Sequence, residues 1–137
     1  VVMMSQNKAK EMGLDIKAAL CGFASAGIHP SIMGYAPVYA VQKLLKKMNL
    51  TVDDIDLFEI NEAFAAQAFA CVRALGLSMD KVNVNGGAIA LGHPVGATGV
   101  RLTISIINEL KRRGLRYGIV TLCIGGGQAI AALVENV

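Results

Sequence analysis

The apolar and polar positions of the chain switch repeatedly between helical and strand periods, with short turns between them. From Ala36 to Met48 the apolar residues recur at helical spacing and lysines occupy the opposite side, which predicts an amphipathic helix. Extended apolar patterns at 16–27, 56–60 and 117–122 predict strands. Helices and strands that alternate in this way are typical of an α/β domain.

Two local signals mark where elements begin. Ser5 is placed to cap a short helix over residues 6–12, which Gly13 closes. Thr51 and Asp54 have the spacing of a capping turn, and we expect this turn to lead into the strand at 56–60.

Three segments indicate that part of the structure lies outside this chain. The helical segments 62–75 and 96–112 carry apolar or small residues on nearly every side, and a helix of that kind is buried all round. We therefore expect both helices to lie between this sheet and another layer that the 137 residues do not supply. Residues 1–5 have the pattern of a buried strand and do not begin with methionine, so we expect a fragment of a longer protein.

The composition limits the class of function. A chain of 137 residues that is 54% hydrophobic can build one domain with a core. The net charge of +3 comes mostly from basic clusters at 43–47 and 111–116, which fit helix ends and solvated faces better than a nucleic-acid site. No apolar run is long enough to span a membrane. Three cysteines without metal-ligand spacing indicate a reducing compartment.

His93 is the first candidate for chemistry. It lies between Gly92 and Pro94, just before a glycine-rich helix start, so the rigid turn presents its imidazole. Its ordinary pKa range suits it to accept a thiol proton at neutral pH. A structural histidine is the alternative, and that interpretation holds for His29, which precedes Pro30 in a turn.

Cys123 is the second candidate, because three glycines follow it at 125–127 and permit close approach by a ligand. Phosphate loops and plain turns also use such glycines, but the Lys-Ser/Thr of a phosphate loop is absent. Cys21 and Cys71 lie in apolar stretches and are interpreted as small core residues. A base and a thiol, each beside exposed backbone N–H groups, are the parts that acyl-thioester chemistry needs.

Asn61 stands between the strand at 56–60 and the apolar helix that follows. It is a natural N-cap for that helix. Its amide has a second available role, which is to hold a water aimed at a reacting oxygen.

Together these segments resemble the three C-terminal motifs of thiolases, the family of acetyl-CoA acetyltransferases and 3-ketoacyl-CoA thiolases. The motifs lie at 61–67, at 83–99 and at 123–127, in the order and at the spacing of the family. The likeness runs from residue 1 to residue 137. Condensing enzymes of the β-ketoacyl synthase type share the ancestral fold, but the cysteine followed by glycines favours the thiolase branch.

The resemblance implies a role for each residue of the proposed site. His93 would deprotonate the nucleophilic cysteine and later the thiol of coenzyme A, and Cys123 would give or take the proton at the α-carbon of the acetyl group. His93 and a water held by Asn61 would stabilise the enolate oxygen. The N–H of Gly125 would belong to a second oxyanion hole. The resemblance also places Met33 and Phe64 at positions that line the pantetheine pocket, with plain packing as the alternative.

The resemblance also implies the architecture and the partners. Residues 6–137 would form the C-terminal domain, and residues 1–5 the last strand of the N-terminal domain, in an α-β-α-β-α layered sandwich with helices on both faces of a mixed sheet. Coenzyme A and its thioesters would be substrates, without metal or other cofactor. The nucleophilic cysteine belongs to the N-terminal half, which this chain lacks, so we expect this chain alone to be inactive.

The same resemblance favours a homo-oligomer when the protein is full length, without nucleic acid or membrane as a partner. A cytoplasmic location is expected, with mitochondria and peroxisomes as alternatives. Two other classes of function are a non-catalytic acyl-CoA-binding module of the same fold and a glycine-rich anion- or nucleotide-binding domain. The presence of His93, Cys123 and Asn61 together argues against the non-catalytic module.

Overall fold

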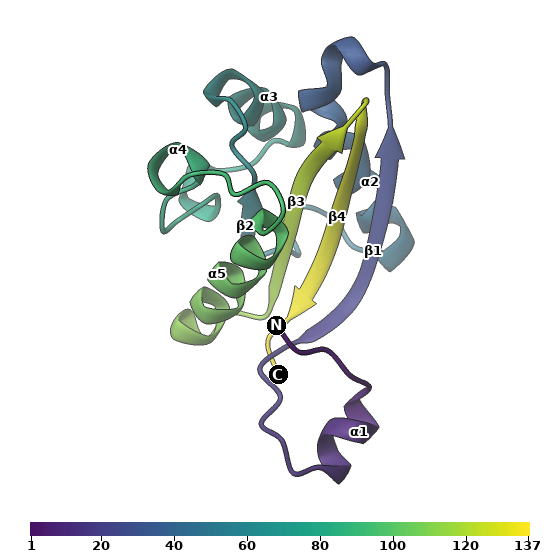
Figure 1. Cartoon of the computed structure of the whole chain (residues 1–137), viewed down its shortest axis with the longest axis vertical. Helices are drawn as coiled ribbons and strands as arrows, with labels where there is room; N and C mark the ends of the chain where they lie inside the picture. The colour runs from purple at the N-terminus through teal and green to yellow at the C-terminus, as the bar shows by residue number, and fades with distance from the viewer.

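A four-stranded mixed sheet lies at the centre of the computed structural model, which describes residues 1–137 (Figure 1). The strand order is β1-β4-β3-β2, with β4 antiparallel to both of its neighbours and β2 parallel to β3. The strands are β1 (Ala19–Gly27), β2 (Leu57–Ile60), β3 (Tyr117–Gly125) and β4 (Gln128–Glu135).

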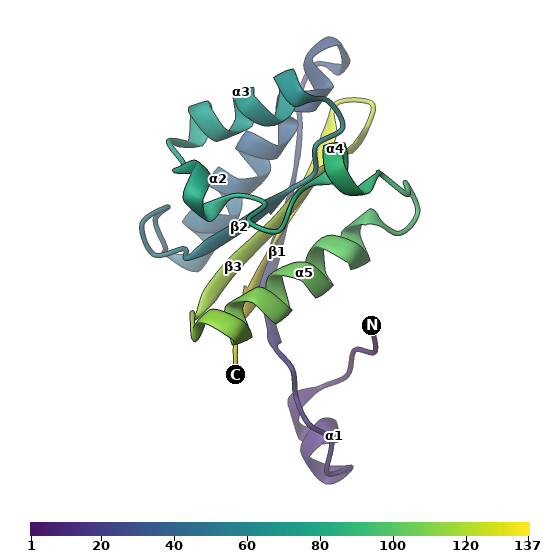
Figure 2. The ribbon, with the colours of Figure 1, turned by 90° about the vertical axis from the view of Figure 1, so that its left-hand side faces the viewer.

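Helices cover both faces of this sheet (Figure 2). The helices of the chain are α1 (Gln6–Glu11), which lies beyond the end of the sheet, α2 (Ala36–Met48), α3 (Ala65–Leu75), α4 (Ala88–Leu91) and α5 (Thr98–Arg113), with the 3-10 turns η1 (Pro30–Tyr35) and η2 (Met79–Lys81). α2 packs on β1, β4 and β3, whereas α5 packs on β3 and β2. The α/β class with helices on both faces is thus confirmed.

The core consists of two apolar clusters, one on each face. β2 shows why, because its side chains alternate between the faces. Phe58 and Ile60 belong to the larger cluster with α2 and α3, while Leu57 belongs to the smaller cluster with α5. All four residues of β2 are buried, as expected for a strand that has packed elements on both faces of the sheet and no face in contact with solvent.

The amphipathic helix is confirmed with the bounds that its pattern predicts. Asn49 follows the last residue of α2 and has the left-handed backbone of a helix cap (φ 54°). Ser5 accepts a hydrogen bond from the backbone N–H of Lys8, as an N-cap should. Asp54 accepts hydrogen bonds from the backbone and the hydroxyl of Thr51, both at 2.7 Å, and this confirms the predicted turn.

The prediction that both apolar helices share one layer is wrong. α3 joins α2 in the larger cluster through residues 71, 72 and 75, and α5 lies on the opposite face of the sheet. A helix with apolar residues on every side has no sequence pattern that indicates which face of a sheet it covers. Each helix also keeps an exposed apolar side, with Phe69 60% and Ile104 45% exposed.

Two further points concern the ends of strands. The sequence pattern ends the strand of Cys123 at Leu122, and this bound is wrong, because β3 runs to Gly125. The strand that follows, β4, has no counterpart among the predicted elements. Residues 1–5 are exposed and pair with no strand of this chain, so the strand predicted there stays a prediction. None of the helices has the length and the apolar composition that crossing a bilayer requires.

Candidate active site

Asn61 follows β2 directly and is 1% exposed. Its backbone N–H donates to the carbonyl of Thr121 on β3 at 3.0 Å, which prolongs the pairing of the two strands. The N-cap role predicted for Asn61 is wrong, because α3 begins at Ala65 with Phe64 at the cap position. The non-helical connection before α3 leaves the Asn61 amide available for other contacts.

Asn83 joins the segment that leads to His93 to the end of β2. Its Oδ1 accepts from the N–H of Ile60 at 2.8 Å, and its Nδ2 donates to the carbonyl of Ile60 at 2.9 Å. The side-chain amide therefore makes the two hydrogen bonds with the backbone of Ile60 that a neighbouring strand would otherwise make. Asn83 has a positive φ of 47°, which asparagine tolerates better than most residues.

Glu62 makes a second connection between the same two segments. Its Oε1 accepts from Nδ2 of Asn83 at 2.8 Å, and its Oε2 accepts from the N–H of Ile89 at 3.0 Å. Gly87 makes room for this carboxylate, since a Cβ there would lie 2.1 Å from Cδ of Glu62. The first two motifs of the sequence are thus hydrogen-bonded to each other.

His93 lies in the turn between α4 and α5, and its neighbours define which nitrogen carries the proton. The Thr98 hydroxyl donates to the carbonyl of Pro94 at 3.0 Å, and Nδ1 of His93 lies 2.7 Å from that hydroxyl oxygen. The one hydroxyl proton is already used, so Nδ1–H must donate to Thr98. In the neutral ring, Nε2 is then an acceptor.

Nε2 of His93 lies 3.3 Å from Nδ2 of Asn61. With the tautomer that Thr98 imposes, the Asn61 amide donates to this nitrogen. Oδ1 of Asn61 is buried and has no hydrogen-bond partner within the chain. The pair therefore offers an acceptor nitrogen, which the Asn61 amide contacts, and an unpaired amide oxygen that can hold a water.

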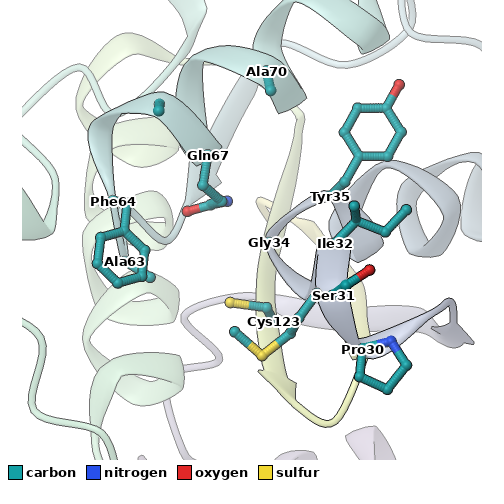
Figure 3. Close-up of a pocket in the computed structure, with 12 residues that line it drawn as sticks. Pro30, Ser31, Ile32, Gly34, Tyr35, Ala63, Phe64, Gln67, Ala70 and Cys123 are labelled. Atoms are coloured by element: carbon teal, nitrogen blue, oxygen red, sulfur yellow. The ribbon is translucent and has the colours of Figure 1, made fainter.

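Cys123 lies near the end of β3, where it pairs with Ala129 just before an irregularity in the register. Its thiol is free, and it lines a cavity of about 530 Å³ together with Met33 and Phe64 (Figure 3). Met33 comes from η1, and Phe64 immediately precedes α3. The structure therefore brings three of the predicted residues to one cavity.

The glycines after Cys123 differ in what they do. Gly125 has a φ of +135°, and a Cβ there would meet no atom within 4 Å. Gly127 has a φ of +87°, and a Cβ there would lie 2.1 Å from the carbonyl oxygen of Ile28. Gly127 thus allows the hairpin to lie against the segment that leads from β1 to η1, whereas the space beside Gly125 is open.

The predicted residues form two groups. Asn61 and His93 are hydrogen-bonded, while Cys123, Met33 and Phe64 share the cavity, whose lining includes neither of the first two. Ala63 and Phe64, which follow Asn61 in the chain, connect the groups.

Sequence reasoning missed several side chains that hold the site together. Thr98 orients His93, and Asn83 and Glu62 join the two motifs. All three lie within the motifs quoted above, but nothing in their pattern indicates which atoms they contact. Gln67, which lines the cavity, was missed for the same reason.

A buried carboxyl lies two residues before Asn61. Glu59 is 3% exposed, and burial raises its pKa to about 7, although the charge of Arg101 opposes the shift. Glu109 on α5 behaves in the opposite way. Hydrogen bonds from Arg112 first, and then from Asn85, lower its pKa to about 2.

The match to known proteins extends over nearly the whole chain. The family model described as "Thiolase, C-terminal domain" matches residues 14–136. The chain belongs to the thiolase family. It is 51% identical to a 3-ketoacyl-CoA thiolase of Aliivibrio salmonicida over 99% of this chain and 36% of that protein. It is 54% identical to the peroxisomal 3-ketoacyl-CoA thiolase B of Rattus norvegicus over 98% of this chain and 32% of that protein.

Solved thiolase structures have the same fold. The acetyl-CoA acetyltransferase of Bacillus anthracis superposes with a TM-score of 0.95 at 51% identity, over 98% of this chain and 34% of that one. Human mitochondrial 3-ketoacyl-CoA thiolase superposes with a TM-score of 0.95 at 47% identity, over 97% and 34%. This thiolase chain therefore spans about a third of the length of the relatives it matches.

Proposed function

We propose that this chain forms the C-terminal part of a thiolase that makes and breaks the carbon–carbon bond of 3-ketoacyl-CoA. The reaction is the condensation of two acetyl-CoA molecules to acetoacetyl-CoA and coenzyme A, or the thiolysis of a 3-ketoacyl-CoA. Membership of the family and the arrangement of the site support this proposal. The free thiols of all three cysteines fit a reducing compartment, for which we propose the cytoplasm.

In the degradative direction His93 acts first. Its Nε2 accepts the proton of a cysteine thiol in the N-terminal half, and the thiolate attacks the 3-keto carbon. The bond between C2 and C3 then breaks, and its electron pair forms the enolate of acetyl-CoA. The S–H of Cys123 protonates C2, and the acyl group remains on the nucleophilic cysteine.

The second half of the reaction releases the acyl group. The imidazolium of His93 first returns its proton to the thiolate of Cys123. His93 then takes the proton of the coenzyme A thiol, the resulting thiolate attacks the acyl-cysteine, and the departing cysteine sulfur takes that proton back from His93. A water held by Asn61, together with the N–H of the imidazolium, stabilises the enolate oxygen, and the N–H of Gly125 stabilises the tetrahedral states.

The orientation of His93 is the observation that carries this proposal. Thr98 fixes the proton on Nδ1, so the nitrogen that faces Asn61 is the basic one. A histidine held by its other nitrogen is the usual arrangement for a general base.

A chimera tests the proposal. This chain replaces the matching third of the Bacillus anthracis acetyl-CoA acetyltransferase, and cleavage of acetoacetyl-CoA by coenzyme A is measured. We expect an active chimera, and we expect His93→Ala to lower the rate by about 10²- to 10⁴-fold. His29→Asn is the matched control, because it changes the other histidine and keeps an acceptor for the N–H of Ser31. A folded chimera in which His93→Ala cleaves as fast as the parent would contradict the proposal.

A further inference from the structure

The segment that carries His93 is held to the rest of the chain at few points. Residues 89–97 are all exposed, so packing on the core does little to place them. α4 has four residues, and a helix of one turn is not stable by itself. Two hydrogen bonds join residues 89–97 to a distant part of the chain, and both lead to the end of β2, beside which α4 lies (Figure 2).

Two adjacent residues after β2 supply the partners of these hydrogen bonds. Asn61 contacts His93, and Glu62 accepts from the N–H of Ile89 at 3.0 Å. Gly87 is the N-cap residue of α4 and makes no side-chain capping hydrogen bond. Because Ile89 is the second residue of α4, the Glu62 carboxylate makes the capping bond from another segment. Asn61 and Glu62 therefore hold the two ends of the piece between Ile89 and His93.

Glu62 contacts two donors that cannot be reversed. Its Oε1 accepts from Nδ2 of Asn83, whose amide is fixed because it also makes both hydrogen bonds with the backbone of Ile60. Its Oε2 accepts from a backbone N–H, which is always a donor. A side chain at this position must therefore offer two acceptor oxygens, and among side chains of this length only glutamate has them.

We propose that Glu62 is a positioning residue that holds Nε2 of His93 against Asn61 through α4. The catalytic consequence rests on the proposed function, which gives His93 the proton transfers, whereas the position of the segment does not. Without the bond to Ile89, α4 loses its anchor on β2, and the imidazole keeps only its single contacts with Asn61 and Thr98. A base displaced by about 1 Å loses roughly a hundredfold in rate.

Hydrogen exchange on the complete protein tests the position of the segment. Glu62→Gln keeps the shape of the side chain but has one acceptor oxygen, so its NH2 group must face the donor of either Asn83 or Ile89. We expect the backbone amides of residues 89–92 to exchange about tenfold faster or more, measured by mass spectrometry on peptides from this segment. The amides of residues 102–110 in α5 should not change. Equal exchange at 89–92 in the variant and the parent would overturn the inference.

Steady-state kinetics tests the consequence for the base. For Glu62→Gln we expect kcat of acetoacetyl-CoA cleavage to fall by about 10- to 100-fold, with KM changed less than about twofold. Glu135→Gln is the matched control, because Glu135 also contacts two side chains, Arg116 and Cys21, and lies at the end of β4 that is remote from Cys123. An unchanged kcat in Glu62→Gln, or a loss confined to KM, would overturn the positioning role.

Gly87→Ala displaces the same carboxylate by another route. A Cβ at Gly87 would lie 2.3 and 2.4 Å from the two carboxylate oxygens of Glu62, and its backbone is extended (φ −103°), which alanine adopts readily. We expect the faster exchange at 89–92 and the fall in kcat again. Gly27→Ala is the control for this substitution, since a Cβ there meets no atom within 4 Å. A folded Gly87→Ala protein that matches the parent in both measurements would overturn the inference.

The two measurements separate this inference from the proposed function. A parent protein that does not cleave acetoacetyl-CoA would contradict the proposed function, and faster exchange at 89–92 in both variants would still support the position that Glu62 imposes. Cleavage by both variants at the rate of the parent would support the proposed function and overturn the inference.

Discussion

At the scale of single residues, the hydrogen bonds around His93 determine which of its ring nitrogens carries the proton. Thr98 is 0% exposed and gives its proton to Pro94, which decides the tautomer of His93. Asn61 and His93 are 32 residues apart in sequence, and their contact is made only after β2 and the turn before α5 come together. The sequence identifies both residues, but the partner that orients His93 could not be predicted from spacing.

Thr98→Val tests the role of this hydroxyl. Valine has a similar shape and cannot accept the proton of Nδ1, so His93 loses the contact that fixes its tautomer. We expect kcat/KM for acetoacetyl-CoA cleavage to fall about tenfold or more, as for the loss of one buried hydrogen bond. Thr98→Ser keeps the hydroxyl and should retain most of the activity. Equal rates for the valine variant and the parent would show that Thr98 does not orient the base.

Glu59 should make stability depend on pH. Its folded-state pKa, about 7, lies above the ordinary value of 4.5. The folded state therefore holds the proton more tightly, and stability falls as pH rises from about 4.5 through 7. Glu59→Gln should remove this loss of stability. The free energy of unfolding should rise by roughly 3 kcal/mol at most at pH 8 and change little at pH 5. Urea unfolding at both pH values measures it, and a variant destabilised equally at both would contradict this account.

At the scale of elements, the lysines of α2 cover the free edge of the sheet. β1 pairs with β4 alone. Lys43 donates to the carbonyl of Ser25 at 3.0 Å, and Lys47 donates to the carbonyl of Phe23 at 3.2 Å. These carbonyls are two residues apart and so point to the same side of the strand. Their capping leaves fewer free acceptors for a strand of another molecule.

Removal of both lysines should expose this edge. We expect Lys43→Ala combined with Lys47→Ala to increase self-association, measured by sedimentation velocity over a range of concentrations. Lys46→Ala is the matched control, since Lys46 lies on the same helix and donates no hydrogen bond to β1. Self-association that rises equally in the control would mean that lost charge, and not the uncovered edge, is responsible.

At the scale of the whole molecule, the sequence predicts the features that depend on neighbouring residues better than those that depend on long-range packing. The stripe of α2 and the cap at Ser5 depend on neighbours within one or two turns, so the sequence was sufficient. The face of the sheet on which α3 lies depends on its contacts with η1 and α2. The hydrophobic periodicity of the sequence carries no information about these contacts. The β4 strand follows the glycines at 125–127, and glycines alone do not distinguish a hairpin turn from a ligand-binding loop. The motifs identified the site residues, whereas their division into a pair and a cavity required the fold.

The exposed apolar side chains of α3 and its surroundings should make the 137-residue chain bind a hydrophobic dye. Phe64, Phe69, Met79 and Ile89 are each at least 60% exposed. Roughly 300 Å² of apolar surface in water corresponds to about 7 kcal/mol of unrealised burial. Phe69→Ser should lower the dye fluorescence without a loss of stability. A monomeric chain that does not bind the dye would contradict the expectation of a covering layer.

The central claim is that His93 and Cys123 carry out different proton transfers, and one pair of measurements on the complete protein tests it. Intact-protein mass spectrometry after incubation with acetyl-CoA reports acylation of the nucleophile, and cleavage of acetoacetyl-CoA reports carbon–carbon chemistry. For Cys123→Ser we expect acylation to persist while cleavage falls by about 10²- to 10⁴-fold, and for His93→Ala we expect both to fall. A Cys123→Ser protein that cleaves acetoacetyl-CoA normally but no longer becomes acylated would contradict the account.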